Sequence, residues 1–376
     1  MQRIYLDHAS TSPLLPSARE AMVPWLGQGF GNPSSLHAEG RSAKQAIDES
    51  REVFSNALGC LFGEVVFTSS GTEAVNLAIL GTALANLHSG RNEILIGSAD
   101  HHCALYTRQI LQHLGIDVKL IPVDREAQVS VETVEEMVGD HTLLVSLIHA
   151  NNEFGTINPV EEIGKVVKES GAIFHVDSVQ TFPGEWGVHD LNADLVSISA
   201  HKFGGPKAVG ALFINAGVDV TPIAVGGGQE REMRAGTENV AGIVGAGAAL
   251  KEVLQDSETE ITRSRARNVF EEKLDPRFKR SVVRAERLGG HSHLRSPGID
   301  SEVFLIRLDR AGVSASSGAA CSSGSLEPSH VMLAAGYSAE ESRQGLRFTF
   351  GRNTTELEAV EAASRVNAAL ESILEK

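Results

Sequence analysis

Residues 142–177, TLLVSLIHANNEFGTINPVEEIGKVVKESGAIFHVD, contain a complete strand–helix–strand pattern. The first eight residues are almost continuously apolar, which is typical of a strand that is covered on both faces of a parallel sheet. In the helix that follows, Asn158 is a suitable N-cap, Pro159 takes the first helical position, and Gly171 ends the helix. The last six residues return as a strand. This unit predicts an α/β fold with a largely parallel sheet.

The same alternation continues on both sides of this unit. Short apolar runs predict further strands, and leucines at helical spacing predict a helix over 73–87. The additional strands are predicted at 64–68, 92–97, 194–199 and 208–214.

The character of the sequence changes near residue 250. A charged, helical stretch over 251–279 is followed by shorter predicted strands, and Thr355 with Glu358 has the capping-box spacing that begins a helix. The pattern predicts a large α/β domain over 15–250 and a small α+β domain made of 1–14 and 251–376. The short strands are predicted at 281–285, 302–308 and 346–350.

The composition and net charge of the chain exclude several classes of protein and partner. The chain has 376 residues, 42% of them hydrophobic, which is enough for a large core. A net charge of -15 would repel a phosphate backbone, so nucleic acid is not an expected partner. Cys60, Cys103 and Cys321 form no CxxC pair, so neither a metal site nor a disulfide framework is predicted. No run is long and apolar enough for a membrane span and no signal-peptide pattern begins the chain, so we expect a cytoplasmic protein.

Residues 69–72, SSGT, join a predicted strand to the helix that follows it. A helix N-terminus offers free backbone N–H groups and the positive end of the helix dipole, which together suit a phosphate. Gly71 permits close backbone approach to such a group, and Thr72 adds a hydroxyl. An ordinary N-capped turn is the alternative interpretation.

Two charged residues, Asp177 and Lys202, also follow buried strands. Ligands of open α/β sheets bind at the carboxyl ends of strands. A buried carboxylate needs a cation, such as a protonated pyridine nitrogen, and a desolvated lysine amine becomes nucleophilic. Ser199 and His201 are able to bind an anion beside the lysine. The alternatives are a structural ion pair or helix cap for Asp177 and an ordinary surface position for Lys202.

A phosphate-binding turn, an acid and a lysine, each at the end of a strand, are the groups that a pyridoxal-phosphate (PLP) site requires. The sequence therefore predicts PLP as a cofactor.

Several long motifs resemble the class V aminotransferase group of fold-type I PLP enzymes, and within it the cysteine desulfurases of the NifS/IscS type. The resemblance extends from residue 4 to about 360. The motifs are YLDHASTSP, FGNPSSLH, FTSSGTEAVNLAILG, HANNEFGTINPVEEIG, HVDSVQ, SAHKFGGPKAVGAL, GGGQEREMRAGTEN, SSGAACSSGSLEPSHV and LRFTFGRNTTELE.

The resemblance implies a role for most polar residues singled out above. Lys202 would hold PLP covalently, Asp177 would pair with the pyridine nitrogen, and Gln180 would bind the phenolic oxygen. His101 would stack on the ring and move protons. The phosphate would be held by Gly71, Thr72, Ser199 and His201, and by Thr237 from the neighbouring subunit of a homodimer.

The substrate and the sulfur acceptor are implied in the same way. Asn152, Asn32 and Arg347 would contact L-cysteine, and Arg347 would clamp its carboxylate. Cys321 would attack the substrate sulfur, leaving a persulfide on the protein and releasing L-alanine. Residues 314–325 are rich in Ser, Gly and Ala, so we expect a mobile segment that carries the persulfide to an acceptor. Iron–sulfur cluster assembly, through a scaffold protein, and tRNA thiolation are the expected destinations.

Three alternatives stay open from the sequence. Cys321 could be a structural cysteine in a Ser-rich turn. The enzyme could be a selenocysteine lyase or another class V aminotransferase, in which a protein thiol need not act. The chain could also bind PLP or a partner without turnover, although the joint presence of Lys202, Asp177 and Cys321 argues against this.

Overall fold

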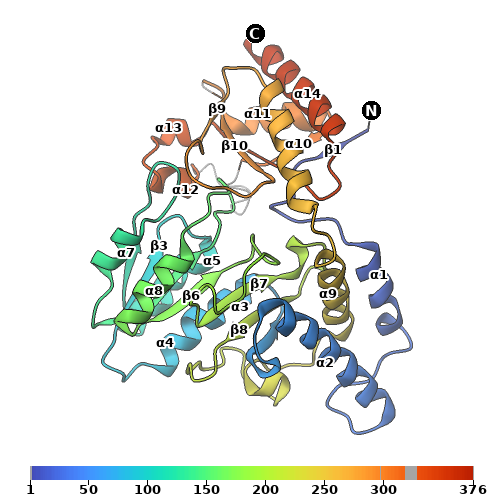
Figure 1. Cartoon of the computed structure of the whole chain (residues 1–376), viewed down its shortest axis with the longest axis vertical. Coiled ribbons are helices and arrows are strands. Elements are labelled where there is room, and N and C mark those ends of the chain that lie inside the picture. The colour runs from blue at the N-terminus through green and yellow to red at the C-terminus, as the bar shows by residue number, and fades with distance from the viewer. Residues whose placement is uncertain (1, 297, 318–327, 376) are drawn as a thin grey trace.

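A central seven-stranded sheet organises the larger part of the molecule in the computed structural model (Figure 1). The structure describes residues 2–296, 298–317 and 328–375. The strand order is β2-β8-β7-β6-β5-β3-β4, and only β8 runs against the others. The predicted α/β fold with a largely parallel sheet is confirmed. The strands are β2 (Val65–Thr68), β3 (Glu93–Gly97), β4 (Asp117–Ile121), β5 (Thr142–Ile148), β6 (Ile173–Asp177), β7 (Leu195–Ser199) and β8 (Gly210–Ile214).

Helices cover both faces of this sheet. Successive residues of a strand point to opposite faces, so the continuous apolar runs place apolar side chains on both. Phe67 packs in one apolar cluster with residues of α2 (Ala38–Leu58), α8 (Val160–Ser170) and α9 (Val240–Val253). Its neighbour Val66 packs in a second cluster with residues of four helices on the other face. These are α3 (Gly71–Asn76), α4 (Thr82–Ala85), α5 (His102–Leu105) and α6 (Thr107–His113). The nearly unbroken apolar runs of the inner strands follow from this burial on two sides.

The strand–helix–strand unit over 142–177 forms as predicted, with one correction at the start of α8. Pro159, not Asn158, is the N-cap residue, and it provides no side-chain cap. The Asn158 side chain instead accepts from Val129 N at 2.9 Å and donates to Ile148 O at 2.8 Å. These long-range bonds compete with capping and tie the loop to the sheet. Gly171 ends the helix in the left-handed conformation, as expected.

The helix predicted over 73–87 begins two residues earlier. Ser70 caps it by accepting from Glu73 N at 3.1 Å, so the helical segment starts at Gly71. The segment comprises α3 (Gly71–Asn76), a π-helical turn (Leu77–Gly81) and α4 (Thr82–Ala85). Beside it lie α5 (His102–Leu105) and α6 (Thr107–His113), whereas α1 (Pro16–Met22) and α7 (Val131–Met137) pack on the other face of the sheet, with α9 and α8.

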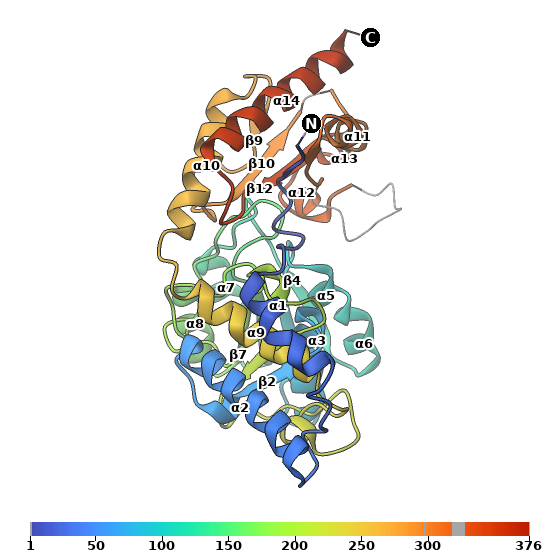
Figure 2. The same ribbon diagram turned by 90° about the vertical axis from the view of Figure 1, so that its right-hand side faces the viewer.

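The C-terminal third forms a separate group of helices around a three-stranded antiparallel sheet (Figure 2). The predicted strand at 302–308 is wrong, because these residues lie in helix α11: Phe304 and Leu308 are buried, whereas Val303 and Ile306 are exposed, which is helical spacing. The elements are β9 (Lys279–Arg280), β10 (His291–Arg295), β12 (Gly345–Thr349), α10 (Thr259–Lys273), α11 (Ser301–Arg310), α12 (His330–Ala334), α13 (Ala339–Ser342) and α14 (Glu356–Leu374).

Two further sequence-based assignments in this region need correction. Residues 281–285 are not a strand, and Val283 is 67% exposed. The strand β10 was not predicted, because its alternating histidines and serines do not form an apolar pattern. The helical stretch expected over 251–279 is interrupted between α9 and α10. The capping box of Thr355 and Glu358 is confirmed at the start of α14.

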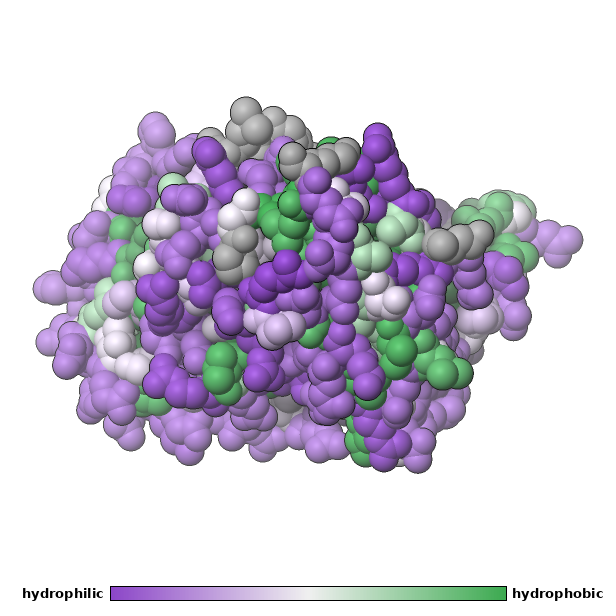
Figure 3. All heavy atoms as spheres, turned by 90° about the horizontal axis from the view of Figure 1, so that it is seen from above, coloured by the Kyte–Doolittle hydropathy of each residue, from purple (hydrophilic) through white to green (hydrophobic). Residues whose placement is uncertain are grey.

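The N-terminal residues pack with this C-terminal group. Strand β1 (Ile4–Tyr5) pairs in parallel with β11 (Val313–Ser314), and Ile4 and Leu6 share an apolar cluster with Phe348. The two ends of the chain therefore lie at the same end of the molecule (Figure 1). Seen from that end, the surface is largely hydrophilic with small separate apolar areas (Figure 3). None of the described helices is long and apolar enough to cross a membrane.

A buried ion pair joins α2 to the segment that follows β8. Arg51 and Glu230 are 2% and 3% exposed at their side chains, and two bonds of 2.7 Å link them. Glu230 also accepts from the backbone N–H of Phe67 in the edge strand β2 at 2.8 Å. Glu230, Arg231 and Glu232 all have positive φ, a conformation that L-residues adopt only when their surroundings impose it. The ion pair is part of what holds this strained turn.

Replacement of Glu230 by Gln should lower the free energy of unfolding by about 3 to 5 kcal/mol, because the Arg51 guanidinium then stays buried without a counter-charge. Chemical denaturation of the two proteins measures the difference. The matched control is Asp309→Asn on α11, which breaks the exposed pair with Arg3 and should change stability by less than about 1 kcal/mol. Equal effects of the two substitutions would contradict this assignment.

Candidate active site

The predicted site residues gather where the parallel strands end. β2, β3, β5, β6 and β7 share one direction, so their carboxyl ends meet at one edge of the sheet, where β8 begins. Gly210 at the start of β8 pairs with both Thr68 and Ser199, which end β2 and β7. Ligand sites of α/β proteins form at this edge. The segments that leave it contain Gly71, His101, Asn152, Asp177 and Lys202.

Asp177 ends β6 and is only 4% exposed. One carboxylate oxygen, Oδ1, accepts from the backbone N–H of Val179 at 3.0 Å. Burial raises the pKa of Asp177 to about 6, against the opposing effects of that hydrogen bond and of the charge of Lys202. A cation placed against this carboxylate would stabilise its charged form.

Lys202 lies on a short turn, Ala200–Lys202, directly after β7. Its Nζ donates to the backbone oxygen of Ala9 and, at 3.2 Å, to that of Ser10. Gln180 Nε2 donates to the same Ala9 oxygen at 3.1 Å. The N-terminal segment thus brings Lys202 and Gln180 to a common acceptor, and the charge of Lys202 acts on the pKa of Asp177. The predicted lysine, acid and glutamine lie in one site.

His101 is the N-cap of α5, and its Nδ1 accepts from the backbone N–H of Cys103 at 3.2 Å. Burial lowers the pKa of His101 to about 4, and the positive charges of Lys202, His102 and His330 act in the same direction. The ring is therefore neutral near pH 7. A neutral, partly buried imidazole is able to stack on an aromatic ring and to accept a proton.

The predicted phosphate-binding turn packs against the ends of β6 and β7. A Cβ atom on Gly71 would lie 2.9 Å from Val179 Cγ2 and 3.1 Å from Ser199 Cβ, so glycine is needed for this approach. Thr72 is exposed beside it, at the beginning of the helical segment. His201 bonds through Nδ1 to Thr11 Oγ1 at 3.1 Å, and burial lowers its pKa to about 4. The structure thus brings Gly71 and Ser199 together at a helix N-terminus.

Arg347 on β12 reaches this edge from the C-terminal group of elements. Its side chain is 3% exposed. Nη1 donates to the backbone oxygen of Asn152 at 2.8 Å, and Nη2 donates to Asp7 Oδ1 at 2.8 Å and to Ser10 Oγ at 2.7 Å. Arg347 Nε and Asn152 Oδ1 are buried and have no hydrogen-bond partner among the described residues. A buried donor and acceptor without partners are unfavourable unless a ligand meets them.

Two of the predicted site residues, Asn32 and Thr237, do not lie in this cluster in the single chain. Asn32 is exposed, and its Oδ1 accepts from Ser34 N at 2.9 Å in its own loop. Thr237 is also exposed.

Cys321 lies outside the described residues. The chain on either side of its segment is attached close to the site. Ser316 exchanges backbone hydrogen bonds with Arg347, at 3.1 and 2.6 Å. His330 bonds through Nε2 to the backbone oxygen of Asp100 at 2.9 Å, next to His101.

Sequence reasoning assigned no role to the residues with which the N-terminal segment enters the site. Asp7 and Ser10 contact Arg347, and the backbone oxygen of Ala9 contacts Lys202. Every residue has a backbone oxygen, so the sequence could not indicate the role of the one in Ala9. Only one feature of the sequence could have indicated a role for Asp7: it is a charged residue directly after the apolar run Ile4–Leu6.

Comparisons with known proteins identify the family of this chain. The family model described as aminotransferase class-V matches residues 4–362. A cysteine desulfurase IscS of Dictyoglomus turgidum is 41% identical over 380 residues, covering 100% of this chain and 95% of the relative. A cysteine desulfurase IscS of Methanosarcina thermophila is 40% identical, covering 94% of this chain and 88% of the relative.

Solved structures lead to the same family. One described as a NifS-like protein has a TM-score of 0.91 and 31% identity, covering 100% of both chains. Another, SspA in complex with cysteine, has a TM-score of 0.83 and 32% identity, covering 93% of this chain and 99% of that one. These findings confirm the resemblance noted in the sequence motifs and the fold-type I architecture. The chain therefore belongs to the class-V aminotransferase family of PLP-dependent enzymes, as a member of its cysteine desulfurase group.

Proposed function

We propose that the edge of the sheet around Lys202 and Asp177 removes sulfur from L-cysteine, and that Cys321 receives the sulfur as a persulfide while L-alanine leaves. The observation that carries this proposal is the meeting of Lys202, Asp177 and His101 at the strand ends beside the unpartnered polar atoms of Arg347 and Asn152. The relatives are cysteine desulfurases, so a selenocysteine lyase is not favoured.

The residues present fit PLP. Asp177 is a buried carboxylate with an elevated pKa, and a protonated ring nitrogen would supply the missing counter-charge. The close contact of Gly71 with Ser199 leaves backbone N–H groups at a helix N-terminus for the phosphate. We assign phosphate binding to Gly71, Thr72, Ser199 and His201, and to Thr237 of the partner subunit.

When bound, PLP supplies an electron sink for the charge that remains after the α-proton of the substrate leaves. Asp177 would keep the proton on the ring nitrogen, and Gln180 would bind the phenolic oxygen. Lys202 would hold the cofactor through its amine, and its Nζ would accept the α-proton of the substrate. His101, neutral because of its burial, stacks on the ring and transfers protons at the substrate.

Arg347 and Asn152 orient the substrate. Arg347 binds the carboxylate of L-cysteine through charge-assisted hydrogen bonds, and Asn152 meets a polar group of the substrate with its unpartnered amide. We assign a further substrate contact to Asn32. The Cys321 thiolate would then attack the substrate sulfur: a sulfur–sulfur bond forms, and the carbon–sulfur bond breaks with its electron pair going to the β-carbon, which takes up a proton. Return of a proton to the α-carbon completes L-alanine.

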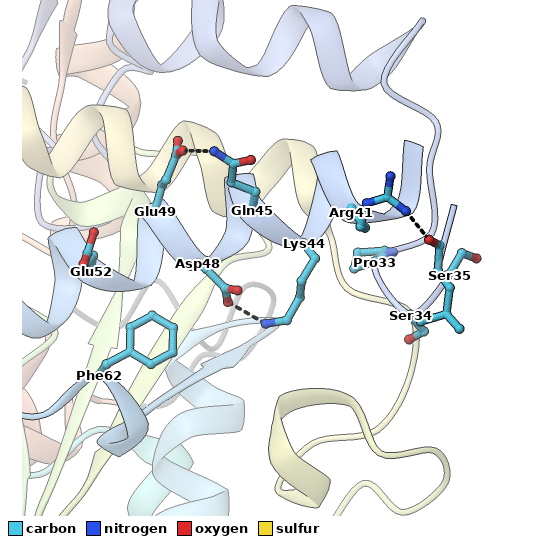
Figure 4. Close-up of a pocket in the computed structure, with 11 residues that line it drawn as sticks. Pro33, Ser34, Ser35, Arg41, Lys44, Gln45, Asp48, Glu49, Glu52 and Phe62 are labelled. Carbon is cyan, nitrogen blue, oxygen red and sulfur yellow. Dashed lines mark hydrogen bonds and ion pairs between the residues drawn. The ribbon is translucent and has the colours of Figure 1, made fainter. Parts of the chain in front are cut away.

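We propose a homodimer, because large apolar side chains are exposed in the segment that precedes α2. Leu26, Phe30 and Leu36 are each more than 70% exposed, and a group of exposed apolar side chains marks an interaction surface. Beside them lies a hollow between α2 and the loops before it (Figure 4). Arg41, Lys44, Asp48 and Phe62 line the hollow. Asn32, in the loop before Pro33, would then belong to the surface that meets the partner.

The remaining assignments complete the proposal. Residues 15–250 form the PLP-binding domain, and 1–14 with 251–376 form the small domain that contains the Cys321 segment. The protein acts in the cytoplasm and passes its sulfur to an acceptor such as an iron–sulfur scaffold or the tRNA thiolation machinery.

Cys321→Ala should retain PLP but form neither persulfide nor alanine at the normal rate, because the acceptor of the sulfur atom is missing. Mass spectrometry after incubation with L-cysteine should show one added sulfur atom on Cys321 of the wild-type chain. Cys60→Ala is the matched control: burial raises the pKa of Cys60 to about 12, so its thiol stays protonated. Normal sulfur transfer by Cys321→Ala would refute the assignment.

The stability of the PLP-free protein should fall as the pH rises, because Asp177 is buried. The pKa of Asp177 is raised from 3.8 to about 6, so the unfolded chain loses this proton first as the pH rises. Stability therefore falls between about pH 4 and pH 6, by on the order of 3 kcal/mol relative to Asp177→Asn. Denaturation across this range measures the difference, and added PLP should remove the fall. Parallel pH profiles of the two PLP-free proteins would contradict the prediction.

A further inference from the structure

The hydrogen bonds of Arg347 leave a specific part of its guanidinium available. A guanidinium has five N–H groups. Both N–H groups of Nη2 are used, one by Asp7 Oδ1 at 2.8 Å and one by Ser10 Oγ at 2.7 Å. Nη1 gives one of its two to the backbone oxygen of Asn152 at 2.8 Å. Nε–H is buried without an acceptor among the described residues.

This distribution prevents a two-point contact with a further carboxylate. A guanidinium presents two parallel N–H groups along two edges, Nε with Nη2 and Nη1 with Nη2, because the third edge is blocked by Cδ. Both usable edges include Nη2. A carboxylate therefore engages Arg347 through two parallel hydrogen bonds only after Asp7 or Ser10 has left Nη2.

The backbone that carries Asp7 and Ser10 is firmly held. Thr349 on β12 donates its N–H to Leu6 O at 2.7 Å, and its Oγ1 accepts from Ala9 N at 2.9 Å. A change of hydrogen-bond partners at Arg347 therefore requires movement of side chains, not of the backbone. Ser10 Oγ already donates to Asp7 Oδ1 at 2.8 Å, and Asp7 is 20% exposed at its side chain, so both groups keep other partners after they release Nη2.

We propose that Asp7 is an internal competitor of the substrate carboxylate: it occupies Nη2 of Arg347 in the substrate-free enzyme, and L-cysteine binds by taking its place. This inference rests on the proposed function of Arg347. Asp7 neutralises the buried guanidinium between turnovers, so the arginine is not left as an unpaired charge. It also selects against small carboxylates, because only a ligand with further contacts in the site displaces it.

The test compares wild-type holoenzyme with Asp7→Asn. Asparagine keeps the shape and one acceptor oxygen, but a neutral acceptor competes less well than a carboxylate. The KM for L-cysteine should fall by about fivefold with little change in kcat. The inhibition constant of L-alanine, which carries a carboxylate, should fall in parallel, whereas that of cysteamine, which has none, should not change.

The matched control is Asp309→Asn, which removes a carboxylate from an exposed ion pair with Arg3 in the same N-terminal segment. All three constants should be unchanged in it. Retention of PLP absorbance reports correct folding of each variant. If Asp7→Asn does not retain PLP, Ser10→Ala removes the other acceptor of Nη2 and should also lower the KM.

An unchanged or higher KM for L-cysteine in the folded variant would overturn the proposal. An equal fall in the cysteamine constant would also overturn it, since the effect would then not involve the carboxylate. Failure of the underlying function is distinguishable, because wild-type enzyme would then release no alanine from L-cysteine at all.

Discussion

The site depends on a buried carboxylate, Asp177, whose charge Lys202 offsets only in part at the carboxyl edge of a parallel sheet. Asp177 is almost completely buried and carries a raised pKa, and the charge of Lys202 opposes that rise. Neither group is favourable alone in such surroundings. The sheet holds both, because β6 and β7 are neighbours that run in the same direction and end together.

Burial shifts the pKa values of the acids and of the histidines in this site in opposite directions. It raises the pKa of Asp177 and lowers that of His101, so near pH 7 the histidine is an uncharged ring next to a carboxylate and an ammonium group. The positive charges of Lys202 and Arg347 therefore remain the principal cations of the site. The phosphate and carboxylate groups of a PLP enzyme's ligands are anions, so this charge distribution suits them.

The C-terminal elements complete the site from the other side. Arg347 projects from β12, and its guanidinium contacts the backbone of Asn152 on the sheet side and Asp7 on the N-terminal segment. Three stretches of the chain that are far apart in sequence thus meet at one side chain. The backbone of the same strand residue pairs with Ser316, shortly before the Cys321 segment. Arg347 and the start of the segment that contains Cys321 are therefore physically connected.

Much of this arrangement was predictable from the sequence, because apolar periodicity records which face of an element is buried. The apolar runs predicted as strands at 142–149 and 172–177 form β5 and β6 to within one residue at one end, and Lys202 and Asp177 were singled out by their places at strand ends. The periodicity failed at 302–308, where charged and apolar residues of a short helix resembled a strand. It also failed at β10, whose histidines and serines are buried without being apolar. Asn158 was expected to cap α8, and only its distant partners explain why it does not.

Local sequence thus determined the fold class and the places of Lys202, Asp177 and the turn 69–72 at strand ends, because each follows from residues adjacent in the chain. Tertiary structure alone decided what surrounds Arg347 and Lys202. Asp7 meets Arg347 across 340 residues, and Ala9 meets Lys202 across 193. Such contacts arise from the packing of β1 on β11 and from the register of distant strands, and no spacing within a segment records them.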